Sequence, residues 1–146
     1  MITVTIDDKS LRARLIAMPV KVRMSLERGI YRLALDLKKY IVREKLSAPA
    51  GYSATLLHKV HAALARSIQQ EVTSTPTSVT GRVYSAGDVD YAAIHEYGGV
   101  FTRYGRKAGD YSVRMPERSY MRTSLKENQE KIVEGIKEAV HEGVMA

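Results

Sequence analysis

The residues best able to do chemistry lie in one short stretch, Tyr91–Gly99, where His95 is followed directly by Glu96. A histidine and a carboxylate, joined by an arginine such as Arg103, can carry out acid–base cleavage of RNA in a small ribonuclease or toxin. The same dipeptide is half of a metalloprotease motif, but the second histidine of that motif is replaced here by Gly99. We therefore expect a structural pair, in which Glu96 binds an arginine and His95 is packed or hydrogen-bonded. The ribonuclease remains an alternative.

Two other histidines, His58 and His61, lie three residues apart and can share one face of a helix. Zinc needs a third protein ligand, and no further histidine or cysteine lies near them in the sequence. The glycines of Gly105–Gly109 do not form a phosphate-binding loop, because the Gly-Lys-Ser/Thr ending is missing. We expect no metal, no cofactor and no enzymatic reaction.

The composition favours one domain, residues 1–146, with a net charge of +7 and no cysteine. The absence of cysteine suits a reducing compartment. No run approaches the roughly 20 apolar residues of a membrane helix, so we expect no membrane segment. The positive charge suits a nucleic acid, an anionic surface or an acidic protein as partner, and equally a solvated basic surface.

Two long amphipathic stretches are expected to position the Tyr91–Gly99 segment. One is a helix from Pro19 to about Leu46, and the other is a helix from Glu117 to about Gly143. Gly29, in the middle of the first helix, indicates a kink or close packing against another helix. The apolar stripe of the first helix, at spacings of three and four, consists of Leu26, Ile30, Leu33, Ala34, Leu37 and Ile41.

Strand-like alternation and turn residues complete the pattern. We predict an antiparallel pair at about Arg66–Ser74 and Ser78–Ser85, and short strands at Ile2–Ile6 and Tyr111–Met115. Shorter helices are predicted at Ser10–Met18, Leu56–Ala65 and Tyr91–Tyr97. The resulting fold class is α+β: a small antiparallel sheet packed with a long helix in the N-terminal half and a C-terminal helix.

The central Tyr91–Tyr97 helix is expected to begin at Asp88 or Asp90 as N-cap and to bury Tyr91, Ile94 and Tyr97. Gly98 can take the left-handed conformation that ends a helix. An extended basic loop follows at about 98–115. Its tyrosines and arginines can stack on nucleic acid or bind a neighbouring subunit, and a solvated loop without a partner is the simplest alternative.

Several short motifs occur in the order known from one family. They are Leu64-Ala65-Arg66-Ser67-Ile68, Gly81-Arg82-Val83-Tyr84, Tyr91-Ala92-Ala93-Ile94-His95-Glu96-Tyr97-Gly98, and Met115-Pro116-Glu117-Arg118-Ser119-Tyr120-Met121. With these motifs the chain resembles the HK97 gp10-like group of phage neck and tail-completion proteins, and their relatives in Mu-like virion morphogenesis. It departs from the group where Ser119 replaces a proline. The resemblance covers about Leu11 to Val140.

The resemblance implies a structural protein of a tailed phage or prophage, found in the virion and, before assembly, in the host cytoplasm. Such proteins join head to tail, or complete the tail end, as a homo-oligomeric ring around the DNA path. The implied partners are further copies of the chain, expected as a hexamer, neighbouring neck, connector or tail-tube proteins, and passing DNA without sequence specificity. No reaction or cofactor is implied. A nucleic-acid-binding module is the competing interpretation.

If the resemblance holds, the loop and the elements beside it form the subunit contact. The residues that we expect at this interface are Tyr91, His95, Glu96, Tyr97, Gly98, Gly99, Phe101, Arg103, Tyr104, Arg106, Arg114, Arg118 and Tyr120.

Overall fold

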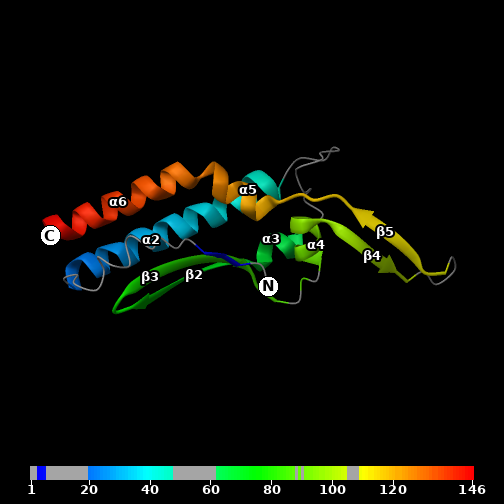
Figure 1. Ribbon diagram of the computed structural model, residues 1–146, viewed down its shortest axis with the longest axis horizontal. Coiled ribbons are helices and arrows are strands. Elements are labelled where there is room, and N and C mark those ends of the chain that lie inside the picture. The colour runs from blue at the N-terminus through cyan, green and yellow to red at the C-terminus, as the bar shows by residue number, and fades with distance from the viewer. Residues whose placement is uncertain (1–2, 6–19, 48–61, 88, 90, 105–108) are drawn as a thin grey trace.

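The computed structural model describes residues 3–5, 20–47, 62–87, 89, 91–104 and 109–146. Their α+β arrangement has the long helix, the C-terminal helix and the antiparallel strands expected from the sequence (Figure 1). The elements are β1 (Thr3–Thr5), α2 (Val20–Tyr40), a π-helical turn (Ile41–Lys45), α3 (Ala62–Ser67), β2 (Ile68–Thr75), β3 (Ser78–Ser85), α4 (Tyr91–Tyr97), β4 (Gly99–Arg103), β5 (Tyr111–Met115), α5 (Tyr120–Glu127) and α6 (Gln129–Met145).

Helix α2 is the centre of one half of the molecule. It lies between α6 on one side and strands β2 and β3 on the other (Figure 1). The predicted apolar stripe is confirmed, because Leu26, Ala34, Leu37 and Ile41 are all buried. The helix continues into the π-helical turn, where Leu46 N–H donates to the Ile41 carbonyl at 3.1 Å. The predicted end of the helix near Leu46 is therefore confirmed.

Small residues allow α2 and α6 to approach closely. A Cβ atom added at Gly29 would lie 2.5 Å from the Cβ of Ala139, so this glycine is required by packing against another helix. On α6, an added Cβ atom would lie 2.7 Å from Leu33 at Gly135 and 2.6 Å from Val22 at Gly143. Gly135, Ala139 and Gly143 are spaced by four residues and so form one small-residue edge of α6.

The three-stranded sheet has the order β1-β3-β2 and is antiparallel throughout. The β2–β3 register runs from Ile68 opposite Ser85 to Thr75 opposite Ser78, which confirms the predicted hairpin. Strand β2 begins at Ile68 rather than Arg66, because α3 continues to Ser67. The hydroxyl groups of Ser67 and Ser85 lie 2.7 Å apart and tie the two strands together where the hairpin begins.

The predicted C-terminal helix is two helices, and its prediction as one element was wrong. The chain breaks at Asn128, whose backbone N–H and side-chain amide both donate to the Ser124 carbonyl, at 3.1 and 2.8 Å. An asparagine side chain that binds a nearby carbonyl competes with the regular helical pattern. The first helix also begins at Tyr120 rather than Glu117.

The end of α5 is bound to the end of α2 through Glu127. Its carboxylate accepts hydrogen bonds from Lys45 Nζ at 2.9 Å and from the Tyr40 hydroxyl at 2.8 Å. The hydrogen bonds from Lys45 and Tyr40 lower the pKa of Glu127 below its ordinary value. The hydrogen bond between Tyr40 and Glu127 also raises the pKa of Tyr40. This partly exposed cluster holds the end of α5, just before α6 begins, against the end of α2.

Several predictions fall outside the described residues. They concern the caps at Asp88 and Asp90, the helix at Ser10–Met18, the start of the helix at Leu56–Ala65, and the side chains of His58, His61 and Arg106.

The close contact between α2 and α6 can be tested with a pair of substitutions, one on each helix. Gly29→Ala should lower the free energy of unfolding by about 1–2 kcal/mol, because overpacking against Ala139 exceeds the gain in helix propensity. The double variant Gly29→Ala with Ala139→Gly should return close to wild type, since the clash is relieved and the propensity changes cancel. Urea unfolding measures both. A double variant less stable than either single variant would contradict this packing.

Candidate assembly site

Helix α4 buries its polar residues rather than its aromatic ones. Ala92, His95 and Glu96 are buried, whereas Tyr97 is 56% exposed. Tyr91 and Ile94 are only half-buried, so the prediction that Tyr91, Ile94 and Tyr97 form the buried face was wrong. The physical reason lies in the neighbouring helix: the start of α5 provides N–H donors that a buried carboxylate can satisfy.

The Glu96 carboxylate caps α5 from outside that helix. One oxygen accepts from the backbone N–H of Met121 at 2.9 Å, and the other accepts from the backbone N–H of Arg122 at 3.0 Å. These are the positions that an N-cap side chain normally serves, and the actual N-cap residue, Ser119, makes no such bond. A negative charge at a helix N-terminus is further stabilised by the helix dipole. We call this arrangement the Glu96 cap.

The Arg122 side chain closes the cap toward solvent. Its Nε donates to Glu96 at 3.1 Å, and one terminal nitrogen donates to the Glu96 carbonyl at 3.1 Å and to the Glu117 carboxylate. The guanidinium also lies 4.7 Å from the centre of the Tyr97 ring. Hydrogen bonding to Glu96 raises the pKa of Arg122. The expectation that Glu96 binds an arginine is confirmed, and the arginine is Arg122.

The residues around the cap are held by buried contacts of their own. The His95 ring meets the Tyr91 ring edge-on with centres 5.8 Å apart, and the His95 carbonyl accepts from Arg118 N–H at 2.9 Å. The Tyr120 hydroxyl donates to the Ala92 carbonyl at 3.4 Å, and burial, assisted by the nearby Glu96, raises the pKa of Tyr120. The carboxylate of Glu96 is fully buried and already accepts three hydrogen bonds. It is therefore badly placed for acid–base cleavage of RNA.

Gly98 makes the turn from α4 into β4. Its φ of +69° is the left-handed conformation predicted for the helix end, and its N–H donates to the Ile94 carbonyl at 2.8 Å. A Cβ atom at this position would lie 2.8 Å from the backbone nitrogen of Glu117. Gly98 therefore allows both the turn and the close crossing of the chain that leaves β5.

The stretch predicted as an extended loop is largely a two-stranded antiparallel ribbon. The strand Tyr111–Met115 is confirmed as β5, but β4 was missed, although Val100, Phe101 and Thr102 are residue types that favour strands. We call β4 and β5 together the arm. Its paired residues, in register, are Gly99 with Met115, Val100 with Arg114, Phe101 with Val113, Thr102 with Ser112, and Arg103 with Tyr111.

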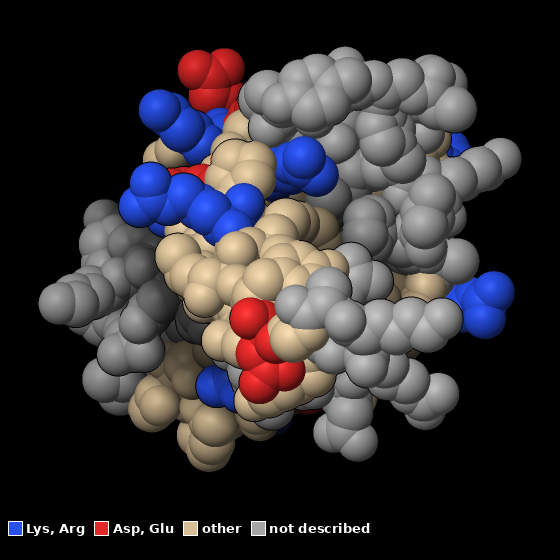
Figure 2. Space-filling model, turned by 90° about the vertical axis from the view of Figure 1, so that its right-hand side faces the viewer, with Lys and Arg blue, Asp and Glu red and all other residues tan. Residues whose placement is uncertain are grey.

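The arm projects from the end of the molecule opposite the C-terminus (Figure 1). Its strands pack chiefly on each other. Large side chains on it and next to it face solvent: Val100 on β4 is 63% exposed, Tyr111 on β5 is 46% exposed, and Tyr104, which directly follows β4, is 80% exposed. Seen from this end, most of the described surface is uncharged, and Lys and Arg side chains gather mainly on one side (Figure 2).

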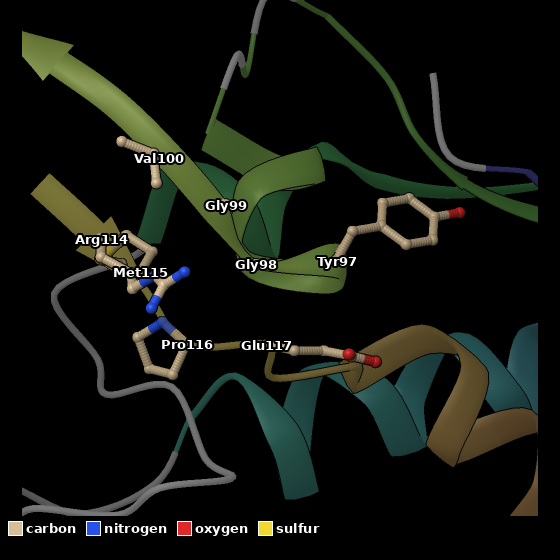
Figure 3. A pocket seen from close by; sticks show the side chains of 8 residues that line it. All are labelled: Tyr97, Gly98, Gly99, Val100, Arg114, Met115, Pro116 and Glu117. Atoms are coloured by element: carbon tan, nitrogen blue, oxygen red, sulfur yellow. The ribbon is translucent and has the colours of Figure 1, made fainter. Parts of the chain in front are cut away.

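A pocket of about 500 Å³ lies at the root of the arm. The turn glycines and Val100 form one wall, and the chain that leaves β5 through Pro116 forms the other (Figure 3). The Tyr97 ring and the Glu117 side chain point away from the strands of the arm (Figure 3). The pocket is lined by Tyr97, Gly98, Gly99, Val100, Arg114, Met115, Pro116 and Glu117.

The structure places in one region those of the expected interface residues that it describes, but it gives them two roles. His95, Glu96 and Tyr120 are buried and hold α4 against α5. Gly98, Gly99, Phe101, Arg103, Tyr104 and Arg114 belong to the arm or its turn, while Tyr91 and Tyr97 lie on α4 and Arg118 lies just before α5. The pocket and the Glu96 cap also include Val100, Met115, Glu117 and Arg122, which the sequence analysis did not place in the expected interface.

Among the described residues, no cluster of His, Cys, Asp or Glu could hold a metal ion. Within the same residues, no helix combines the length and the apolar character that crossing a bilayer requires.

Residues 42–141 match the model of the phage virion morphogenesis family, and the chain belongs to this family. The matched region runs from the end of the long helix into α6 and so includes α4, the arm and α5. No curated protein and no solved structure matches the chain. Membership indicates a part in building the phage particle, which agrees with the wider family relationship inferred from the motifs.

Glu96 and Glu117 both bind Arg122, but we predict that their removal affects stability very differently. Glu96→Gln should lower the free energy of unfolding by about 2–3 kcal/mol, because buried N–H groups and Arg122 lose a charged acceptor. Glu117→Gln, at the exposed end of the same network, should change it by no more than about 0.5 kcal/mol. Thermal and urea unfolding measure both variants, and equal effects would show that the cap is unimportant.

The turn at Gly98 offers a second matched comparison. Gly98 and Gly109 have nearly equal φ angles, +69° and +71°, but a Cβ atom at Gly109 meets no atom within 4 Å. Both alanine variants bear a strain of about 1–2 kcal/mol from the left-handed conformation. Only Gly98→Ala adds a clash with Glu117, so it should be further destabilised by about 1–3 kcal/mol. Equal losses on unfolding would contradict the close crossing at this turn.

Proposed function

We propose that this member of the phage virion morphogenesis family is a structural subunit of the neck or upper tail end, where it joins head to tail or completes the tail. Copies would form a homo-oligomeric ring around the DNA path and contact neighbouring neck, connector or tail-tube proteins. The observation that carries this proposal is the exposed arm, which we propose as the contact between one copy and the next.

The arm lacks the packing that a two-stranded ribbon needs. An isolated ribbon of two strands is marginally stable in water and normally requires a further strand or a packed face. Among the described residues, β4 and β5 pack chiefly on each other, and neither outer edge of the ribbon has a partner strand. A neighbouring subunit can supply the missing contacts.

The side chains on the arm suit a protein partner. Val100 and Arg114 are opposite each other near the start of β4, and Tyr104 directly follows the other end of this strand. Tyrosine and arginine are enriched among the residues that contribute most to binding in protein interfaces. Because the arm and the surface that receives it are different patches, the contact is heterologous, which is the type that closes a ring.

The rigid root gives the arm a fixed direction. The Glu96 cap binds α4 to α5, and Gly98 places the start of β4 against the chain that leaves β5. Both ends of the ribbon therefore leave the folded domain from one fixed place. A contact presented on such a rigid base loses less conformational entropy when it binds.

The proposal is tested by changing the arm surface without changing the fold. Val100→Ser, Tyr104→Ser and Arg114→Ser together should leave thermal stability nearly unchanged, because exposed substitutions usually change it by at most about 0.5 kcal/mol each. In a phage or prophage that lacks this gene, the triple variant should fail to restore infectious particles. Electron microscopy should then show heads and tails that are unjoined, or tails that are unfinished.

The control changes three exposed residues on α6, two valines and one cation, away from the arm: Val133→Ser, Lys137→Ser and Val144→Ser. This control should complement normally. Normal particles from the arm variant would refute the arm as the joining surface. Complete particles from cells that lack the gene would refute the assembly role itself.

A further inference from the structure

The positive charge of the chain is concentrated on its long helix. Residues 20–45 contain eight Lys or Arg and three Asp or Glu, which is a net +5 of the total +7. Three exposed cations, Arg28, Arg32 and Lys39, follow spacings of four and seven, so they lie within about 40° of one another around α2 and extend over about 17 Å. Arg43, which is also exposed, lies about one turn further along, in the π-helical turn. We call these four residues the basic stripe.

The two carboxylates of α2 do not neutralise the basic stripe. Glu27 pairs with Arg23 at 4.0 Å, and Asp36 pairs with Lys131 of α6 at 3.6 Å. The ion pairs formed by the described residues include no member of the basic stripe. The charges of the four cations are therefore available to a partner.

Helix α6 places most of its acidic charge away from the basic stripe. Its small-residue edge packs on α2, so Glu130 and Glu134 lie on the opposite side of α6. A cavity of about 490 Å³ between the two helices is bordered by Arg28 and Arg32. Among the described residues, Glu142 is the one glutamate of α6 that lines this cavity. The stripe therefore faces a single carboxylate of α6, at one end of its length.

A second hollow lies on the other side of the stripe. It has a volume of about 370 Å³ and is formed by α2 together with Val72 of β2. Arg28 and Arg32 line this hollow as well as the first, so they stand on the ridge between the two. Arg28 also donates to the Met24 carbonyl of its own helix, and the side chains of Met24 and Tyr31 are exposed beside the cations. The exposed face of α2 is thus basic along its ridge, with two apolar side chains next to it.

The basic stripe fits a polyanion better than a protein surface. The centre of a protein interface is depleted of charged residues, and a cation left unpaired there is costly. Duplex DNA carries one negative charge for about every 1.7 Å of its axis, so a row of cations can meet phosphates along its whole length. Contacts with phosphate carry no sequence information, so they suit DNA of any sequence. We propose that the exposed face of α2 binds the phosphate backbone of duplex DNA.

This face would line the inside of the ring that we propose, so its place in the particle rests on that proposed function. The arm projects from one end of the molecule and α2 lies in the other half, so the contact between copies and the contact with DNA use different surfaces (Figure 1). One copy supplies only a few phosphate contacts. A ring repeats the same contacts around the DNA, so weak binding by each copy adds up to a stronger hold.

The test is binding of the purified chain to a labelled DNA duplex of about 30 base pairs, measured by fluorescence anisotropy at salt concentrations from about 50 to 200 mM. Each neutralised phosphate contributes about −0.9 to the slope of log K against log salt, so the four cations predict a slope of about −3 to −4. The basic-stripe variant, Arg28→Ala with Arg32→Ala and Lys39→Ala, should make this slope shallower by about 2.7 and weaken binding at low salt by at least about tenfold.

The control variant removes the same amount of charge from three exposed helical cations elsewhere: Arg66→Ala, Lys126→Ala and Lys137→Ala. It should keep the wild-type slope and bind DNA within about twofold of the wild type, because exposed charges more than a Debye length from the DNA are largely screened. Circular dichroism verifies that every variant is folded.

A wild type that does not bind the duplex at low salt, or a basic-stripe variant that keeps the wild-type slope and affinity, would overturn the proposal. If that variant keeps its DNA affinity but fails to restore infectious particles, the face binds an acidic protein surface instead, which also overturns it. None of these results bears on the arm, which is tested by complementation with the arm variant. Normal particles from the arm variant would in turn refute the ring contact and leave the measured DNA affinity as it is.

Discussion

The structure depends on one buried carboxylate. Glu96 lies on α4 but satisfies the first free N–H groups of α5, and Arg122 completes the arrangement. Without this bond α5 would begin with unsatisfied donors, since Ser119 does not cap it. The same bond fixes the root of the arm, because α4 leads into β4 and α5 follows β5. One interaction therefore determines both where the last helices begin and where the arm points.

Two surfaces of different character result from this arrangement. At one end, the arm presents tyrosine, valine and arginine on a ribbon whose strands, among the described residues, pack chiefly on each other. At the other end, α2 and α6 pack closely through small residues. A protein that builds a particle needs contacts that are specific for different neighbours, and electrostatic and apolar surfaces select different partners. In our proposal the arm makes the contact that closes the ring.

The sequence predicted those features that depend on local pattern. The apolar spacing of α2, the β2–β3 hairpin and the left-handed Gly98 all follow from periodicity or backbone conformation. The buried face of α4 could not be predicted in this way, because it is decided by donors at the start of α5, about 25 residues further along the chain. The break at Asn128 depends on a side-chain amide that donates to the Ser124 carbonyl. The apolar pattern continues through this position, so the pattern alone predicts one helix. Of the expected interface, the sequence indicated the region, while the separation into buried supports and exposed arm required the fold.

The central claim is that the arm acquires its missing contacts from a neighbouring subunit in the particle. Hydrogen exchange of backbone amides, compared between the purified chain and purified virions, tests it most directly. We predict that amides of Val100–Arg103 and Tyr111–Arg114 exchange quickly in the free chain and are protected in virions, while those of α2 are protected in both. Arm amides that exchange equally quickly in the virion would contradict the account.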